Sequence, residues 1–285
     1  AGEAGEGVRQ VRQPVKADIQ LLQVSESAQL GGQGGQLVVA EVELPQLPQS
    51  THHLRAQGGQ PVVAHVQLGE VVAELGGGPN GAAIGPDAAV YVCNNGGFEW
   101  IERDDGFLAP HGTPKDYKSG LIQRVDLASG AVTMVYDACE GRPLRGPNDI
   151  VFDRQGGFWF TDLGKTIGEQ WFTGALYYAL PDGSKIVRAR DALFSPNGVG
   201  LSPEEDMVHV ADTRTGRLWS YRIAEPGVVA PPASRWSLGR CVSLPGYQML
   251  DSLAVEADGK VCVATIVNSG ITVFEGDGVF EHVPV

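Results

Sequence analysis

Residues 146–162 read GPNDIVFDRQGGFWFTD, and this stretch decides the fold. A Pro-Asn pair precedes a short apolar run, a turn with two glycines follows, and alternating aromatic residues end at Asp162. Two strands joined by a tight polar turn give this pattern, because side chains alternate between the two faces of a strand. Phe158 and Phe160 are therefore expected to face one way and Trp159 the other. The stretch predicts a β-hairpin whose first strand starts near Asn148.

Three further segments repeat this pattern, namely PNGAAIGPDAAVYVCN (79–94), PNGVGLSPEEDMVHVAD (196–212) and DSLAVEADGKVCVAT (251–265). Each begins with a polar residue and continues as a short strand, a turn with Asp, Gly or Pro, and a second strand. The starting residues, spaced 68, 49 and 54 positions apart, are Asn80, Asn148, Asn197 and Asp251. A four-stranded propeller blade takes roughly 40–50 residues. The spacing therefore predicts one blade per repeat.

The sequence predicts an all-β protein with radially repeated sheets, a β-propeller. No apolar period of 3.6 residues, which would indicate a helix, runs over a useful length. The long first interval holds an extra loop at roughly 99–119. Residues 266–285 are interpreted as a partial fifth blade.

The first 69 residues differ from the rest of the chain. They hold 12 of the 16 glutamines and none of the 21 aromatic residues, the first of which is Tyr91. Aromatic side chains supply much of the buried area of a core, so such a segment packs poorly. A disordered tail, a weak β-region, and a stretch read in the wrong frame and joined to a genuine protein near Glu70 all fit. We favour the third, which an unbroken frame across codons 60–75 of the transcript would refute, and expect domains at 1–69 and 70–285.

Composition favours small molecules or cations as partners. The 34 acidic and 21 basic residues give a net charge of −13, whereas a nucleic-acid surface needs a basic patch. No apolar run approaches the roughly 20 residues that span a bilayer. The N-terminus lacks signal-peptide features, and the four cysteines form no CxxC pair. We expect a cytoplasmic protein that binds a small molecule, with no nucleic-acid or membrane partner; the sequence leaves its oligomeric state open.

The residues that start the four repeats are expected to converge. In a propeller, the start of each innermost strand lies near the central channel. Asparagine offers a neutral oxygen and aspartate a charged one, and a hard cation such as Ca²⁺ is bound by several oxygens. A single Pro-Asn pair is typical of a turn, but its recurrence at one phase of the repeat favours a role as ligand.

GPNDIVFDRQGGFWFTD, SPNGVGLSPEEDMVHVAD and LDSLAVEADGKVCVA together resemble the family of senescence marker protein-30, gluconolactonase and the luciferin-regenerating enzyme. The resemblance covers about residues 71–285, with the three motifs in the same order. It implies a six-bladed β-propeller with a divalent metal at the mouth of its channel, and the first blade would be degraded or missing in this chain. It also implies hydrolysis of lactones, with relatives that act on phosphotriesters.

Carried over by motif, the resemblance implies Asn197 and Asp251 as metal ligands and Asn148 as a ligand of metal or substrate. Arg145 lies near the position of a substrate-binding arginine in some members, and Asn80 holds the equivalent position one blade earlier, so both are expected to bind substrate. Ca²⁺ is the expected metal, with Zn²⁺, Mg²⁺ or Mn²⁺ as alternatives. Asp251 is the expected catalytic residue, which would orient or deprotonate the attacking water.

One departure from the family affects the metal site. Family members carry a glutamate in a Pro-Glu-Gly-Pro-like motif of the first blade, whereas Glu41, Glu43 and Glu70 lie in a different context. Losing a carboxylate lowers Ca²⁺ affinity. The sequence thus predicts a metal-dependent lactonase, a carboxylic ester hydrolase that acts on sugar-type lactones. The alternatives are a non-catalytic propeller that binds calcium or a ligand, and a phosphotriesterase-like or strictosidine-synthase-like propeller.

Other polar residues are expected to be structural. Asp162 and Asp212 end second strands and are expected to cap turns, as are Asn94 and Asn95 in the equivalent strand. His111 is expected to be a solvated residue of the long loop. The absence of HxxxH and HxH pairs disfavours a zinc hydrolase, and the absence of GxSxG disfavours a serine nucleophile.

Overall fold

The computed structural model describes residues 21–26, 35–40, 70–104, 106, 108–231 and 239–285. Within these ranges the chain forms β-strands, and one turn of 3₁₀ helix, Gly276–Gly278, is the sole helical element. None of the described helices has the length and apolarity that a membrane crossing needs. The all-β expectation is confirmed. Glu41, Glu43 and most of residues 1–69 lie outside the described ranges, so the proposed division of the chain at Glu70 stays a prediction.

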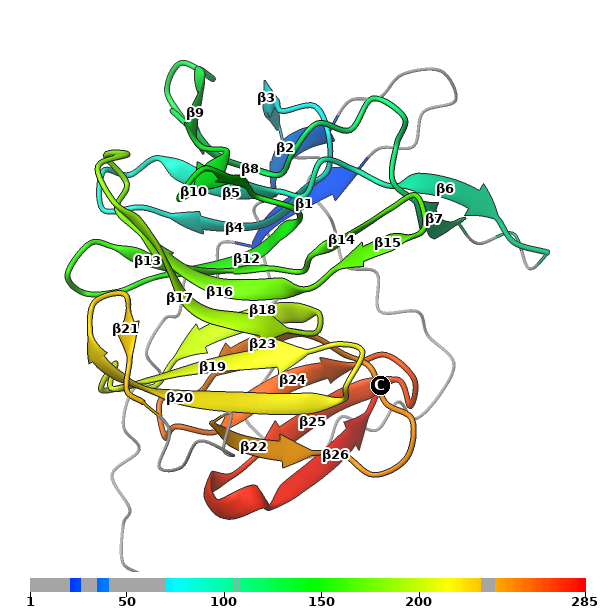
Figure 1. The fold of residues 1–285 in the computed structure, drawn as a ribbon, viewed down its shortest axis with the longest axis vertical. Helices are drawn as coiled ribbons and strands as arrows, with labels where there is room; N and C mark the ends of the chain where they lie inside the picture. Colours follow the sequence, from blue (N-terminus) through cyan, green and yellow to red (C-terminus); the bar gives the residue numbers. More distant parts are fainter. Residues whose placement is uncertain (1–20, 27–34, 41–69, 105, 107, 232–238) are drawn as a thin grey trace, which may run out of the picture.

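Five antiparallel sheets follow one another along the chain (Figure 1). The first has the strand order β1 (Leu21–Glu26), β2 (Gly35–Ala40) and β3 (Glu70–Glu74). The second contains β4 (Pro79–Ile84), β5 (Val90–Asn94), β8 (Leu121–Val125) and β9 (Val132–Tyr136). The third contains β12 (Pro147–Phe152), β13 (Phe158–Asp162), β16 (Gly174–Ala179) and β17 (Ile186–Leu193).

The last two sheets complete the series. The fourth has β18 (Pro196–Leu201), β19 (Met207–Asp212) and β20 (Arg217–Glu225), and β20 also pairs with β21 (Val228–Val229) and β22 (Arg240–Ser243). The fifth has β23 (Leu250–Val255), β24 (Val261–Thr265), β25 (Gly270–Phe274) and β26 (Phe280–Pro284). Separate two-stranded hairpins pair β6 (Glu99–Glu102) with β7 (Leu108–Gly112), β10 (Ala138–Cys139) with β11 (Arg142–Pro143), and β14 (Lys165–Ile167) with β15 (Gln170–Phe172).

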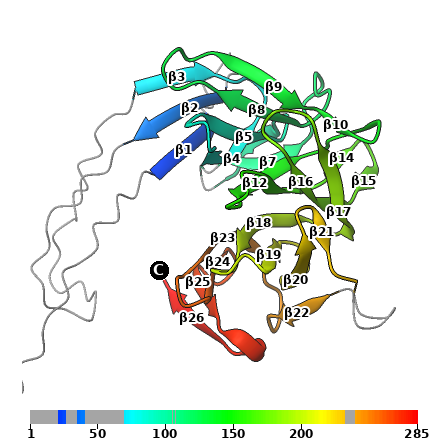
Figure 2. The same cartoon turned by 90° about the vertical axis from the view of Figure 1, so that its left-hand side faces the viewer.

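The sheets are arranged radially, as in a β-propeller. The strands β1, β4, β12, β18 and β23 pack next to one another in this order. Figure 2 shows the sheets around a common centre, with the first and fifth sheets at the two ends of an arc. In the part of the chain that the structure describes, β23 does not pack closely against β1. The propeller is therefore confirmed as the architecture, whereas the count of six blades stays a prediction.

Residues 266–285 do not start a fifth blade. They form β25, which pairs with β24 of the fourth repeat, and β26, which pairs with β25. The sequence interpretation of this segment was wrong. A hairpin such as β23–β24 leaves an edge of unpaired backbone groups, and the strands that follow next in the chain pair with that edge.

The alternation of aromatic residues in the third sheet is confirmed. Phe158 and Phe160 pack with Tyr91 between the second and third sheets. Trp159 packs with Val208 and other residues between the third and fourth sheets. Each of these aromatic side chains contributes about 1.5–3 kcal/mol by burial, so β13 stabilises the contacts of its sheet with both neighbours.

The four repeat hairpins have similar turns, although the turn between β18 and β19 is one residue longer than the others. In each of them a backbone N–H donates across the turn to a carbonyl oxygen, at 2.8 or 2.9 Å. One residue per turn has a positive φ, which glycine adopts without steric cost. These residues, with their φ angles, are Ala88 (59°), Gly156 (87°), Glu205 (58°) and Gly259 (88°).

We expect Ala88→Gly to raise the free energy of unfolding by about 0.5–1 kcal/mol. A residue with a Cβ atom loses about 1–2 kcal/mol in the left-handed conformation, and the added freedom of glycine in the unfolded chain offsets part of that gain. Ala88 is exposed, so its methyl group contributes little by burial. Urea denaturation measures the change. Gly259→Ala, at the equivalent position, should lower stability, and a destabilised Ala88→Gly protein would contradict the explanation.

His209 is expected to make the fold sensitive to acid. Its Nδ1 lies 2.8 Å from the hydroxyl of Ser220, and burial lowers its pKa from 6.5 to about 4. Below pH 6.5 the unfolded chain takes up a proton that the folded chain refuses, so stability falls between pH 6.5 and 4, by roughly 3 kcal/mol. His209→Gln should flatten this dependence in urea titrations at pH 7, 5 and 4. An equal change from His111→Gln, which alters an exposed residue, would contradict it.

Candidate functional site

Four inner strands begin with the same β-bulge. The first residue of each strand pairs with the last residue of the next strand, and regular pairing resumes three positions later. Two residues of the inner strand therefore face one residue of its neighbour, which bends the strand and redirects side chains. The first residues of the bulges are Asn80, Asn148, Asn197 and Asp251. The predicted equivalence of these four positions is confirmed by the backbone register.

Asn197 and Asp251 meet across two neighbouring blades. Nδ2 of Asn197 donates a hydrogen bond to Oδ1 of Asp251 at 2.7 Å and another to the hydroxyl of Thr213 at 3.2 Å. Asn197 is 8% exposed, and Asp251 is partly buried. Within the described part of the chain, Oδ1 of Asn197 and Oδ2 of Asp251 have no hydrogen-bond donor. Two oxygens from adjacent blades are thus available to a ligand.

Asn148 and Asn80 lie on the neighbouring inner strands β12 and β4, and Arg145 lies in the segment just before β12. Asn148 is 5% exposed, and its amide makes no hydrogen bond to any described residue. Asn80 is exposed at the equivalent position of β4. Arg145 is partly buried three residues before Asn148, and its guanidinium stacks 4.2 Å from the ring of Phe172.

A network that the sequence did not reveal connects the bulges of β12 and β18. One carboxylate oxygen of Asp149 accepts the N–H of Ile150 at 2.9 Å, and the other accepts the N–H of Val199 at 3.1 Å. The N–H of Asp149 donates to the hydroxyl of Thr161 at 3.2 Å. That hydroxyl donates to the backbone carbonyl of Asn197. Asp149 and Thr161 thereby fix the position of Asn197 relative to β12.

The surroundings of Asp149 leave little free volume. A Cβ atom on Gly81 would lie 2.7 Å from Oδ1 of Asp149, so glycine is required on the neighbouring inner strand. Burial, and to a lesser degree the negative charge of Asp251, raise the pKa of Asp149 to about 6, although the two backbone N–H groups oppose this. The sequence marks this position, because the third residue of the motif Pro-Asn-Asp is charged, whereas the corresponding residue of the other repeats is glycine or serine.

The residues that end the second strands hold the segments that lead into the bulges. The buried carboxylate of Asp162 accepts the N–H groups of Arg145, Gly146 and Gly164 at 2.7, 2.7 and 2.9 Å. Burial raises the pKa of Asp162, and these hydrogen bonds counteract the rise. Asp212 accepts two N–H groups, and Asn94 accepts two, at equivalent places. The prediction that these residues have structural roles at turns is confirmed.

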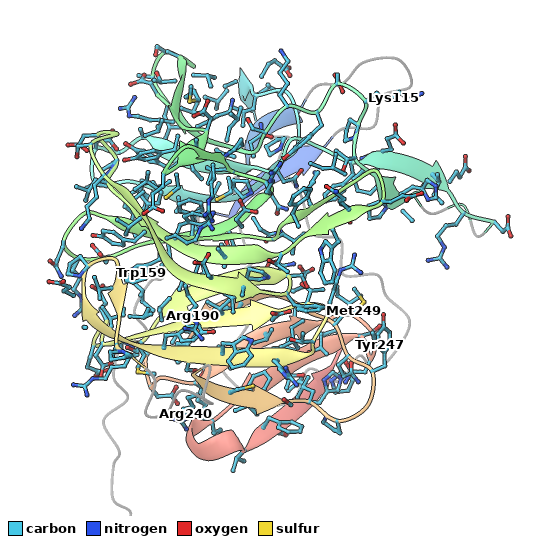
Figure 3. The ribbon with its side chains drawn as sticks, viewed as in Figure 1. Lys115, Trp159, Arg190, Arg240, Tyr247 and Met249 are labelled. Carbon is cyan, nitrogen blue, oxygen red and sulfur yellow. The ribbon has the colours of Figure 1, made fainter. Side chains whose placement is uncertain are left out.

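The segments around these bulges are rich in aromatic residues. Buried Lys165 donates to the carbonyls of Asn95 and Gly97 and lies 4.1 Å from the ring of Phe98. On the segment that leads into β23, the Tyr247 hydroxyl lies 3.3 Å from Sδ of Met249 (Figure 3). His111, in the long loop, is exposed as expected.

The described residues contain no group of three or more His, Cys, Asp or Glu side chains placed to hold a metal ion. Asp251 supplies the one carboxylate among the first residues of the four bulges. Glu70 begins β3, the outer strand of the first sheet. A cation at the bulges would therefore depend on amide oxygens in addition to Asp251.

A family model described as the SMP-30/gluconolactonase/LRE-like region matches residues 47–285. The chain belongs to this family. It is 30% identical over 134 residues to the lactonase drp35 of Staphylococcus haemolyticus, covering 46% of this chain and 39% of that protein. It is 27% identical over 168 residues to the gluconolactonase of Zymomonas mobilis, covering 55% and 40%. The chain thus spans about 40% of the length of these curated relatives.

A solved structure supports the fold of this family member. It is that of a gluconolactonase from Xanthomonas campestris, with a TM-score of 0.55 and 23% identity. The match covers 75% of this chain and 65% of the other. The likeness supports the β-propeller architecture, and the family resemblance predicted from the three motifs is confirmed.

Proposed function

We propose that this family member is a metal-dependent hydrolase of sugar-type lactones, with its site at the bulges of β12, β18 and β23. The observation that carries the proposal is the pairing of Asn197 on β18 with Asp251 on β23 at 2.7 Å. Strand β18 also packs against β12, which holds Asn148. The family membership and the names of its lactonase relatives support the same reaction class.

The side-chain oxygens of Asn148, Asn197 and Asp251 are suited to coordinate a hard divalent cation. Ca²⁺ is the expected ion, and Zn²⁺, Mg²⁺ and Mn²⁺ are the alternatives. All three residues offer oxygen atoms, and Asp251 also carries a negative charge. Ca²⁺ binds 6–8 oxygens, and water molecules can supply those that the protein does not. When bound, the cation would act as a Lewis acid on the lactone carbonyl. These three residues would hold it, and Asn80, Asn148 and Arg145 would contact the oxygens of the substrate.

Asp251 is the proposed catalytic residue. Its Oδ2 would orient a water molecule and accept a proton from it. The water oxygen adds to the carbonyl carbon, the bond from that carbon to the ring oxygen breaks, and the ring oxygen takes up a proton. The product is an open-chain hydroxy acid. The substrate is thus a small molecule, and the cytoplasmic location stays a prediction.

One observation favours a second candidate, a propeller that binds calcium or a ligand without catalysis. Among the first bulge residues a single side chain is charged, and Ca²⁺ affinity rises with the number of charged ligands. Such a site would bind weakly and turn over no substrate. Activity measurements separate the two candidates.

The test is hydrolysis of a panel of aldonolactones, followed with a pH indicator, because each turnover releases a proton at neutral pH. Calcium is added, removed with a chelator and added again. Activity that disappears with the chelator and returns with calcium is the expected result. A folded protein that hydrolyses no lactone under any of these conditions would contradict the proposed enzyme and favour the binding propeller.

A further inference from the structure

Two arginines lie on either side of the strand β15. The guanidinium carbon of Arg145 lies 4.2 Å from the centre of the Phe172 ring, and that of Arg214 lies 5.3 Å from the centre of the Trp171 ring. Successive side chains of a strand point to opposite faces. Trp171 and Phe172 therefore place one cation on each face of the hairpin β14–β15.

In the part of the chain that the structure describes, neither guanidinium is paired with a carboxylate. Arg124, Arg154 and Arg188 form ion pairs, whereas neither Arg145 nor Arg214 pairs with a carboxylate among the described residues. This lack is notable in a chain with 34 acidic and 21 basic residues. An aromatic ring holds a guanidinium by its flat face, so that N–H groups along the edge can bind a carboxylate or phosphate with two parallel hydrogen bonds. The Arg145 side chain already interacts with the hydroxyl of Tyr117.

The backbone places both arginines beside the proposed site. The N–H of Arg214 donates to Oγ of Ser195 at 2.8 Å, and the preceding residue, Thr213, contacts the amide of Asn197. The N–H of Arg145 donates to the buried carboxylate of Asp162 at 2.7 Å, three residues before Asn148. The backbone of each arginine is thus tied to a segment that lies next to one of the site asparagines.

The ring contacts restrict how the Arg214 side chain moves. Trp171 packs edge-on against Phe194, with ring centres 4.5 Å apart, and Phe194 directly precedes Ser195, which binds the backbone of Arg214. Arg214, Trp171 and Phe194 therefore form one cluster although Arg214 is exposed. A cation that is exposed, held in place and unpaired is suited to bind an anionic group from solution.

We propose that Arg214 binds an anionic group on the substrate, so that the preferred lactones carry a carboxylate or phosphate besides the lactone ring. This inference rests on the proposed lactonase function. The site would then prefer anionic lactones, and an assay with a neutral sugar lactone alone would not detect this preference.

The test compares three lactones at equal concentration. They are glucono-1,5-lactone, which is neutral, glucaro-1,4-lactone, which carries a carboxylate, and 6-phosphogluconolactone, which carries a phosphate. The expected result is a kcat/KM at least about tenfold higher for one of the anionic lactones, with a KM that rises with salt because screening weakens the attraction. The two anionic lactones show which anion is preferred.

Variants assign the effect to Arg214. Arg214→Gln should lower kcat/KM for the preferred anionic lactone by about 10–100-fold, the range expected for a charge-assisted hydrogen bond, and that for glucono-1,5-lactone less than about threefold. Arg214→Lys should fall between. Arg154→Gln is the matched control, since Arg154 lies in the turn at the far end of β12 and already pairs with Glu205.

Two results would overturn the inference. One is equal or better turnover of the neutral lactone by the wild-type protein, and the other is an unchanged substrate preference in Arg214→Gln. If no lactone is hydrolysed, the proposed function fails separately, and calorimetric titration with glucarate still tests the anion site. Glucarate binding that weakens in Arg214→Gln would support the site, and no binding by the folded wild-type protein would refute it.

Discussion

Replacement of Asp251 by alanine is expected to lower kcat/KM for lactone hydrolysis by about 10²–10³-fold, the range found when one preorganised polar group is removed from an active site. Asp251 carries the single charge among the first bulge residues, and its Oδ1 holds the amide of Asn197 at 2.7 Å. The variant loses a proposed metal ligand and the proposed proton acceptor together. Initial rates with a pH indicator, at saturating calcium, measure the loss.

Asp258→Ala is the matched control for Asp251→Ala. Asp258 lies in the exposed turn at the opposite end of the same hairpin, where it accepts the N–H of Lys260 at 3.2 Å. Its replacement should leave kcat/KM within about twofold, since it lies away from the bulges. If Asp251→Ala kept a third or more of the wild-type activity, the catalytic assignment would be wrong.

Asp162→Ala is expected to lower the free energy of unfolding by about 3–5 kcal/mol. The change removes the acceptor of three backbone N–H groups, and each buried donor left without a partner costs about 1–3 kcal/mol. Removing the negative charge of a buried carboxylate offsets part of this loss, because burial has already raised its pKa. Urea denaturation at pH 7 measures the change.

A second readout follows from the position of Asp162. Two of its three partners, Arg145 and Gly146, lead into the bulge that carries Asn148, so KM should rise even at temperatures where the variant is folded. Asp126→Ala is the control, because Asp126 binds Ser129 in an exposed turn and should cost less than about 1 kcal/mol. If Asp162→Ala lowered the free energy of unfolding by less than about 1 kcal/mol, the hydrogen bonds to the Asp162 carboxylate would not be needed for stability.

The recurring hairpin pattern, with Pro-Asn pairs in three of the four repeats, was sufficient to predict the equivalence of Asn80, Asn148, Asn197 and Asp251. This inference succeeded because strand alternation and turn chemistry are local properties, which a sequence records directly. The structural roles of Asp162 and Asp212 were predicted for the same reason. Each stands at the end of an alternating strand, where a side-chain acceptor can reach nearby N–H groups.

The network around Asp149 and Thr161 could not be predicted in this way. Its hydrogen bonds join β12, β13 and β18, and the partners Asp149 and Val199 are 50 positions apart. Nothing in the pattern of one repeat shows which backbone groups of the next blade remain unpaired. One signal was present, because Asp149 stands where the other repeats have Gly81, Gly198 or Ser252, and a charged residue at a position of small residues deserves a partner.

The assignment of residues 266–285 to a new blade failed for a related reason. A repeat period fixes how often a hairpin recurs, but the sheet to which the following strands belong depends on which edge is unpaired. The strands β25 and β26 complete the sheet that β23 and β24 begin. In the first sheet, β1 and β2 pair with each other and with β3, a pairing that the composition of residues 1–69 did not predict.

Calorimetric titration of Ca²⁺ into the wild-type protein and into Asn197→Ala tests most directly whether the bulge residues form a cation site. One binding site per chain is expected for the wild-type protein, with an affinity at least about tenfold weaker in Asn197→Ala, because that variant loses a donor oxygen and the hydrogen bond that holds Asp251. An absence of binding by the folded wild-type protein, or equal affinities in the two proteins, would contradict the assignment of Asn148, Asn197 and Asp251 as metal ligands.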